Sequence, residues 1–133
     1  MLDMEHTNDA IRAALERGHT IDITTTGRRS GAPRRIEIVF HNIDERIYIS
    51  GLPSQRKRSW LANLEAKPHL TFHLKGRVRA DLPATARVIT DEAERRTILQ
   101  HVARNWRRSD VETMVRYSPL IEVTFDPARV AVS

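Results

Sequence analysis

The chain has no cysteine, few aromatic side chains and no long apolar run. Without cysteine there is no disulfide framework, thiol nucleophile or zinc–thiolate site. Aromatic residues make up only 5% of the 133 residues, which leaves few side chains on which nucleic-acid bases could stack. The apolar runs are far shorter than the roughly 18 residues that a transmembrane helix needs, and no signal peptide opens the chain. We therefore expect a soluble, cytoplasmic protein with one domain over residues 1–133.

Positive charge is concentrated in one segment rather than spread over the chain. The net charge of the protein is +5, and residues 28–58 alone hold eight basic residues against three acidic ones, so the rest of the chain is balanced. The basic residues are Arg28, Arg29, Arg34, Arg35, Arg46, Arg56, Lys57 and Arg58. A localised positive field attracts an anionic ligand. Either basic cluster taken alone also fits a solvated turn or the exposed start of a helix.

Residues 24–35 predict a tight turn between two strands. A run of threonines leads into two glycines and a proline, and four arginines flank them. Glycine lets the backbone bend and approach a ligand closely, and the amides of such a turn can form an anion-binding nest. Arginine binds phosphate or carboxylate through paired hydrogen bonds. The turn therefore predicts a binding site for a polyanionic small molecule.

Hydrophobic periodicity predicts six strands and four helices. The expected strands are 20–26, 36–41, 46–50, 69–74, 77–89 and 119–125. The expected helices begin at Asn8 or Asp9, at Ser54, near Thr90 and at Ser109, and they end at Gly18, near Ala66, beyond Trp106 and near Arg116. The helix at Ser109 is expected from the Ser-x-x-Glu spacing of a capping box, and Pro83 predicts a bend or bulge in its strand.

This order of elements favours a mainly β protein with helices. Strands joined mostly as hairpins predict a six-stranded antiparallel barrel with the helices outside it. We expect an N-terminal helix within residues 1–18 and the barrel within 19–133. No Gly-x-Gly-x-x-Gly turn lies in a βαβ pattern, which argues against a Rossmann cofactor domain.

Two motifs resemble a known family. The first is Thr25-Thr26-Gly27-Arg28-Arg29-Ser30-Gly31-Ala32-Pro33-Arg34-Arg35. The second follows about 25 residues later and is Trp60-Leu61-Ala62-Asn63-Leu64-Glu65-Ala66-Lys67-Pro68. In this order and spacing they resemble the deazaflavin-dependent nitroreductase and quinone-reductase family, over roughly residues 20 to 126. The resemblance implies a split β-barrel of the FMN-binding, pyridoxamine-phosphate-oxidase-like type that uses reduced coenzyme F420.

The resemblance also implies where the cofactor binds. Coenzyme F420 has a flavin-like tricycle and a tail with a phosphodiester and several glutamate carboxylates. In the family the glycine–arginine turn contacts this tail. By resemblance the tail contacts become Gly27, Arg28, Arg29, Ser30 and Gly31, with Pro33 and Arg34 beside them.

A second set of residues is implied around the tricycle and the phosphate. By resemblance the tricycle is flanked by Ser50, Gly51, Trp60 and Asn63, and the phosphate is covered by Arg56, Lys57 and Arg58. Plain alternatives stay open for these residues: Trp60 also fits core packing, Asn63 a polar helix residue, and the three basic residues an exposed helix face.

The resemblance implies hydride transfer from the reduced deazaflavin to an electron-poor acceptor such as a quinone, an activated alkene or a nitro compound. Relatives that reduce nitro compounds carry tyrosines before the last strand, where this chain has Tyr117, with Trp106 and Met114 nearby. Tyr117 is therefore the candidate proton donor, and the apolar residues suit a planar, hydrophobic acceptor. The nearest alternative is an FMN-dependent oxidoreductase on the same barrel.

Three further expectations concern partners. A nucleic-acid-binding module could use the basic segment, but the three phenylalanines fall on inward strand phases, so we expect no nucleic acid partner. His41 and His73 fall on outward strand phases without an acidic partner, so we expect no metal site. The resemblance suggests a homodimer, to whose interface the outward Val39, His41 and His73 could contribute.

Overall fold

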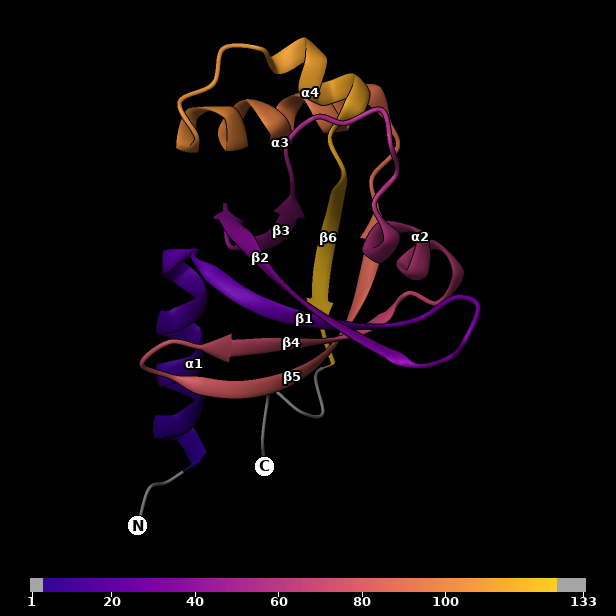
Figure 1. Ribbon diagram of the computed structural model, residues 1–133. Coiled ribbons are helices and arrows are strands. Elements are labelled where there is room, and N and C mark those ends of the chain that lie inside the picture. The colour runs from indigo at the N-terminus through magenta and orange to yellow at the C-terminus, as the bar shows by residue number, and fades with distance from the viewer. Residues whose placement is uncertain (1–3, 127–133) are drawn as a thin grey trace.

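The computed structural model describes residues 4–126, and its strands close into one antiparallel barrel (Figure 1). Around the barrel the strands follow the order β1-β2-β3-β6-β5-β4, and β4 pairs with β1 to close it. The strands are β1 (Thr20–Thr26), β2 (Pro33–Ile43), β3 (Arg46–Ser50), β4 (His69–Lys75), β5 (Arg79–Val88) and β6 (Leu120–Phe125). The predicted six-stranded barrel with peripheral helices is confirmed.

Four helices of the described residues 4–126 lie outside the barrel. They are α1 (Met4–Arg17), α2 (Ser59–Ala66), α3 (Glu92–Asn105) and α4 (Val111–Tyr117). In Figure 1, α3 and α4 together cover one end of the barrel, α1 stands against one side, and α2 lies on the other side, close to the long β1–β2 hairpin. None of these helices is long and apolar enough to cross a membrane.

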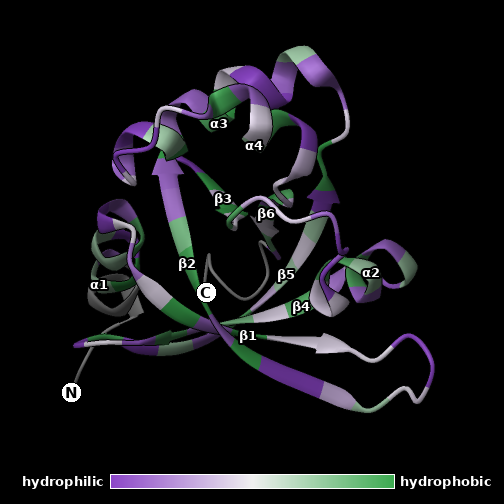
Figure 2. Cartoon of the chain, turned by 45° about the horizontal axis from the view of Figure 1, so that its top comes forward, coloured by the Kyte–Doolittle hydropathy of each residue, from purple (hydrophilic) through white to green (hydrophobic). Residues whose placement is uncertain are grey.

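Two apolar clusters hold the molecule together. The first fills the barrel, where Ile23 and Phe72 are fully buried and Phe40 packs edge-on against Phe72. The second lies beneath α3 and α4 and includes Leu99 and Met114, which are also fully buried. Figure 2 shows hydrophobic residues, in green, along the strands of the barrel and in the helices above it. The alternation that predicted inward positions in β1 and β4 reflects the two-residue period of a strand.

Two helix starts differ from the prediction. Helix α1 begins at Met4 rather than at an Asn8 or Asp9 cap, so the residues before Asn8 are already helical. The helix ends before Gly18, which has a φ of 63°, as expected for a glycine that terminates a helix. Helix α2 begins at Ser59 and not at Ser54. The Ser54 hydroxyl instead accepts a hydrogen bond from the Arg56 amide and forms a local turn.

The predicted capping box at the start of α4 is wrong. The carboxylate of Glu112 binds the Arg96 guanidinium at 2.7 and 2.8 Å, so it does not reach back to the helix start. The helix follows Asp110, whose carboxylate pairs with Arg108 instead of capping a backbone amide.

The predicted bulge at Pro83 is absent, since β5 pairs with β4 in unbroken register through the Thr71–Pro83 pair, although β5 curves along its length (Figure 1). The Pro83 carbonyl accepts a hydrogen bond from the Asp126 amide, on the β6 side of the strand. In a β-strand the backbone N and O of one residue point toward the same neighbouring strand, so the nitrogen of Pro83 also faces β6. The β5–β6 ladder begins only at the next residue, Ala84. The proline therefore removes no bond from the β4–β5 ladder.

The two histidines expected on the outer surface are both buried. His41 is covered by the end of α3, where Trp106 packs edge-on against the imidazole and the Asn105 amide lies 3.2 Å from its Nδ1. His73 has an acidic partner after all: its Nδ1 lies 2.7 Å from the Asp81 carboxylate, which the register places opposite it on β5. Within residues 4–126, no three metal-ligating side chains gather closely enough to hold an ion.

Candidate functional site

The β1–β2 turn is held in shape by its own hydrogen bonds. The Gly27 amide donates to the Ala32 carbonyl, and the Gly31 amide donates to the Gly27 carbonyl, both at 2.8 Å. A Cβ on Gly27 would lie 2.9 Å from the Ser30 hydroxyl oxygen, and Gly31 has a φ of 74°. Both glycines are therefore required by the turn itself.

These bonds exclude most of the predicted anion-binding nest. The Ala32 amide donates to the Ser30 hydroxyl and the Arg28 amide donates to the Asn63 side chain, so four amides of the turn already have acceptors. An anion at this turn would therefore have to be bound mainly through side chains.

Asn63 joins the turn to helix α2. Its Oδ1 accepts hydrogen bonds from the Arg28 amide at 3.1 Å and from the Arg28 guanidinium at 3.0 Å, while its Nδ2 donates to the Thr25 hydroxyl at 3.1 Å. Asn63 and Thr25 are 3% and 2% exposed. The structure thus places Asn63 behind the turn as a support, with its carbonyl oxygen occupied by Arg28.

A cleft of about 580 Å³ lies between the turn and α2; we call it the turn cleft. It is lined by Thr25, Gly27, Arg28, Arg29, Ser30, Pro33, Arg34, Arg35, Ile36, Ser59, Trp60 and Asn63. Eight of the predicted cofactor residues therefore line this cleft: six from the turn, together with Trp60 and Asn63. The seventh predicted residue of the turn, Gly31, lies between lining residues of the turn but does not line the cleft itself.

The four arginines of the turn cleft differ in what they already bind. The Arg28 guanidinium binds Asn63, and the Arg35 guanidinium binds the Asp22 carboxylate at 2.9 Å. Arg29 and Arg34 have no side-chain hydrogen bond or ion pair within the described part of the chain, and the Arg34 Nε lies over the turn, 3.6 Å from where a Cβ of Gly27 would be. Two cations are thus available to a ligand.

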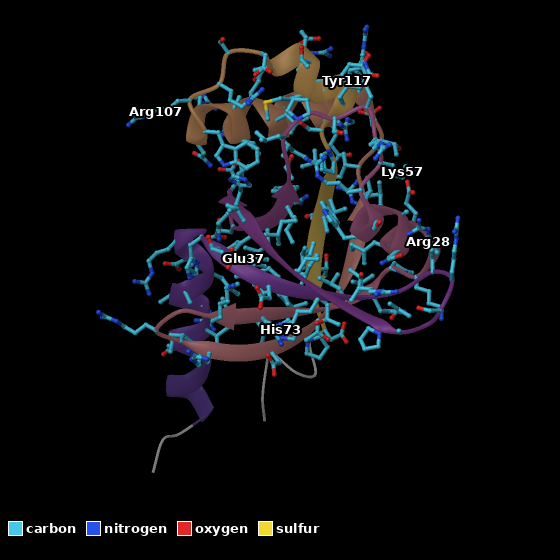
Figure 3. The ribbon with its side chains drawn as sticks, viewed as in Figure 1. Arg28, Glu37, Lys57, His73, Arg107 and Tyr117 are labelled. Atoms are coloured by element: carbon cyan, nitrogen blue, oxygen red, sulfur yellow. The ribbon has the colours of Figure 1, made fainter. Side chains whose placement is uncertain are left out.

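A second cavity of about 490 Å³ lies on the other side of α2; we call it the loop cavity. Its walls come from residues 54–58, from α2, from the β5–α3 junction and from the end of α4. The amide of Ser54 donates to the Tyr117 carbonyl at 3.2 Å, which ties this loop to α4. Figure 3 shows Lys57 and Arg28 on the α2 side of the molecule, with Tyr117 at the end of α4 above them.

The basic residues 56–58 all line the loop cavity, but they are engaged differently. The Lys57 ammonium binds Glu65 at 2.7 Å, and the Arg58 guanidinium donates to the Leu52 carbonyl at 2.7 Å. Arg56 is exposed and has no side-chain partner among residues 4–126. Arg56 is therefore the free cation of this cluster.

Ser50 and Gly51 do not line either cavity. The buried Ser50 hydroxyl donates to the Pro119 carbonyl at 2.7 Å. A Cβ on Gly51 would lie 3.1 Å from both the Arg58 guanidinium and the Pro119 ring, so Gly51 lets these two groups pack closely over the strand end. The predicted tricycle neighbours are thus divided, with Ser50 and Gly51 beneath the loop cavity and Trp60 and Asn63 in the turn cleft.

Three residues of the loop cavity were missed by sequence reasoning: Arg95, Arg116 and Ser118. Arg95 comes from α3 and donates to the carbonyls of Ile89 and Ser118, among others, and burial lowers the pKa of its guanidinium. Nothing in the sequence around Arg95 indicates a ligand site, because its position falls on the apolar face of the helix. For Arg116 and Ser118, the only indication in the sequence is that they are adjacent to the predicted Tyr117.

Both cavities border the start of α2, which makes them neighbours. Ser59 and Trp60 face the turn cleft, and Arg58 and Leu61 face the loop cavity. An elongated ligand with a flat ring and an anionic tail matches two adjoining cavities with free cations in each.

The comparisons with known proteins decide the family. Residues 3–124 match the F420H(2)-dependent quinone reductase family. The chain belongs to this family. No curated protein matches it in sequence.

Solved structures share the fold of this family member at low sequence identity. An F420-H2 dependent reductase is 22% identical, with 79% of this chain and 93% of that chain covered and a TM-score of 0.58. A putative pyridoxamine 5'-phosphate oxidase from Listeria innocua is 14% identical, with 90% and 93% covered and a TM-score of 0.65. A protein described as a domain-swapped dimer is 20% identical, with 90% and 95% covered and a TM-score of 0.59. The predicted pyridoxamine-phosphate-oxidase-like fold is confirmed.

Proposed function

We propose that this protein binds reduced coenzyme F420 and transfers a hydride to an electron-poor acceptor, such as a quinone, an activated alkene or a nitro compound. Membership of the F420H(2)-dependent quinone reductase family supports an oxidoreductase that uses this cofactor. The observation that carries the proposal is the pair of adjoining cavities, each with a free arginine, on the two sides of α2.

The residues fit the anionic part of the cofactor. Arg29 and Arg34, with Gly27, Arg28, Ser30, Gly31 and Pro33 shaping the turn, would hold the carboxylates of the tail. Arg56, Lys57 and Arg58 would hold the phosphodiester at the start of α2. A single phosphate, as in FMN, would leave one of the two cation groups without an anion.

The ring end of the cofactor fits the loop cavity. Its volume of about 490 Å³ lies within the roughly 300–1,000 Å³ range of small-molecule sites, and Leu61, Ile89 and Leu120 give it an apolar wall. Trp60 would border the path between the two cavities. Ser50 and Gly51 would support the ring from below, and Asn63 would act by fixing the turn.

The protein's part in the reaction is binding, orientation and exclusion of water. The bound deazaflavin supplies the hydride. Reduction of a quinone also consumes protons, and Tyr117, a partly exposed residue that lines the loop cavity, is our candidate donor. The apolar wall holds a flat acceptor in place, and residues 54–58, tied to α4 through Ser54, limit the access of water.

Replacing Arg29 and Arg34 together with alanine is expected to weaken binding of the deazaflavin about a hundredfold, at about tenfold for each lost contact with an anion. Binding is followed by quenching of tryptophan fluorescence, because Trp60 lines the turn cleft. The matched control is the Arg77→Ala, Arg79→Ala variant, which removes two exposed arginines from the region joining β4 and β5. An affinity that changes equally in both double variants would contradict the proposal.

The same titration tests the FMN alternative. We expect saturation at low micromolar concentration with the deazaflavin and not with FMN. Tight binding of FMN, lost in the Arg56→Ala variant alone, would favour the FMN-dependent oxidoreductase instead.

We also propose that the protein forms a homodimer, as the resemblance suggests and as one structural neighbour does in domain-swapped form. His41 and His73 are both buried, so of the three residues predicted for the interface only Val39 remains partly exposed. Light scattering is expected to give about twice the chain mass of 15.3 kDa, and a mass of one chain at micromolar concentration would refute the dimer.

A further inference from the structure

The α4 side of the loop cavity contains polar groups that the proposed cofactor contacts do not use. Arg116 and Ser118 flank Tyr117 and line the cavity with it. The Arg116 side chain is exposed and has no hydrogen bond or ion pair with any other residue of the described range 4–126. Its neighbour Glu112, one helical turn earlier, is already bound to Arg96.

Ser118 adds a buried hydroxyl without a partner. The residue is 4% exposed, and its Oγ makes no hydrogen bond to any described residue. A buried hydroxyl that lacks a partner costs free energy, typically about 1–3 kcal/mol. The Oγ is closed off from solvent, so a ligand group in the cavity would become its partner only after the Ser118 side chain rotates about χ1.

A second cation lies behind these residues. The Arg95 guanidinium donates to four backbone carbonyls, those of Ile89, Met114, Val115 and Ser118. None of its partners in residues 4–126 is a carboxylate, so its positive charge is not neutralised locally. A partly buried charge of this kind favours an anion nearby.

The acidic groups of the cavity do not cancel this charge. Glu65 is bound to Lys57, and the exposed Glu92 lies 3.7 Å from the Arg96 guanidinium. The lining also includes apolar residues beside the Arg95 guanidinium, among them Val88, Ile89 and Leu120. The loop cavity thus combines apolar lining residues with the Arg95 and Arg116 cations and the buried hydroxyl of Ser118, which has no partner among the described residues.

We propose that the loop cavity selects electron acceptors in which a planar ring carries a carboxylate, and that Arg116 is the residue that recognises it. Arg116 binds the carboxylate, the Ser118 hydroxyl donates a second hydrogen bond, and the Arg95 charge favours the anionic form. This inference rests on one part of the proposed function, namely that the electron acceptor binds in the loop cavity.

The first experiment measures binding without turnover. Calorimetric titrations compare 2-naphthoate with the neutral 2-naphthamide, using the full chain with and without oxidised cofactor. We expect 2-naphthoate to bind at least tenfold more tightly than 2-naphthamide, either to the protein alone or to the protein with oxidised cofactor bound. The Arg116→Gln variant is expected to lose this preference, and Arg116→Lys to retain part of it. The control is Arg107→Gln, since Arg107 follows α3 and lies far from Tyr117 in Figure 3.

The second experiment separates acceptor selection from cofactor binding. We expect the Arg116→Gln variant to bind the deazaflavin as the unaltered protein does, and to lose about tenfold in kcat/KM with 1,4-naphthoquinone-2-carboxylate but not with 1,4-naphthoquinone. Equal binding of naphthoate and naphthamide by the unaltered protein would overturn the proposal. A preference that survives in Arg116→Gln, or a tenfold loss of cofactor affinity in that variant, would overturn it as well.

The outcomes also distinguish this inference from the proposed function. If the unaltered protein fails to bind the deazaflavin but still prefers naphthoate through Arg116, the cofactor assignment fails and the carboxylate site stands. If the cofactor binds and the preference is absent, only the carboxylate site fails.

Discussion

Replacing Asn63 with alanine is expected to lower the free energy of unfolding by about 4 kcal/mol, which for a chain of this size corresponds to a fall in Tm of roughly 12 °C. The substitution removes two hydrogen bonds from Arg28 and one to Thr25, all at a buried position. It also leaves the buried Thr25 hydroxyl without this partner. Thermal unfolding followed by circular dichroism measures the effect.

The Asn63 substitution is also expected to weaken deazaflavin binding about tenfold, although the Asn63 carbonyl oxygen faces Arg28. The reason is that Arg28 and the turn lose their fixed position against α2. The control is Asn63→Asp, which keeps an oxygen acceptor for both Arg28 donors and is expected to lose much less of either property. A Tm within 2 °C of the unaltered protein in Asn63→Ala would show that the turn is held by other contacts.

Acidification is expected to destabilise the protein by about 3 kcal/mol through His41 alone. Burial lowers the pKa of His41 from 6.5 to about 4. Between these two values the unfolded chain binds a proton that the folded protein does not, so stability is full above pH 6.5 and falls as the pH drops toward 4. Urea unfolding at several pH values measures this loss.

A His41→Gln variant isolates the contribution of His41. Glutamine offers the Asn105 amide a partner but does not titrate, so the variant is expected to lose about 2 kcal/mol less than the unaltered protein between pH 6.5 and 4.5. Acid-sensitive ion pairs, such as the one between Arg96 and Glu112, are common to both proteins and cancel in the comparison. Parallel pH profiles would show that the imidazole is solvated when the protein is folded.

The sequence predicted the barrel well because the barrel depends on local alternation. Strand β1 has the predicted bounds, and its inward Ile21 and Ile23 are fully buried. The start of α2 could not be predicted in this way. Ser54 is a favourable residue for a helix cap, but its amide is taken by the Tyr117 carbonyl, a contact between positions 63 residues apart. Helix α2 therefore begins only at Ser59, after the loop of residues 54–58 has left its contact with α4.

In the candidate site, too, the features that depend on neighbouring residues in the sequence were predicted, and those that depend on distant residues were not. The arginines of the turn were evident from their spacing, but which of them are free depends on partners from other elements. Arg35 is paired with Asp22 across the β1–β2 ladder, and Arg28 with Asn63 from α2. Likewise, the Asp81 partner of His73 is fixed by the β4–β5 register and has no signature in the sequence between them.

The position of α2 as a common wall of both cavities limits how this protein can diversify. Helix α2 contributes residues to the lining of both the turn cleft and the loop cavity, whereas α4 borders the loop cavity and contributes nothing to the lining of the turn cleft. New acceptor preferences are therefore expected to arise through changes in α4, with the cofactor's anchoring left intact. Libraries built to redirect the enzyme toward other oxidants should vary the end of α4 and keep the eight residues of α2 constant.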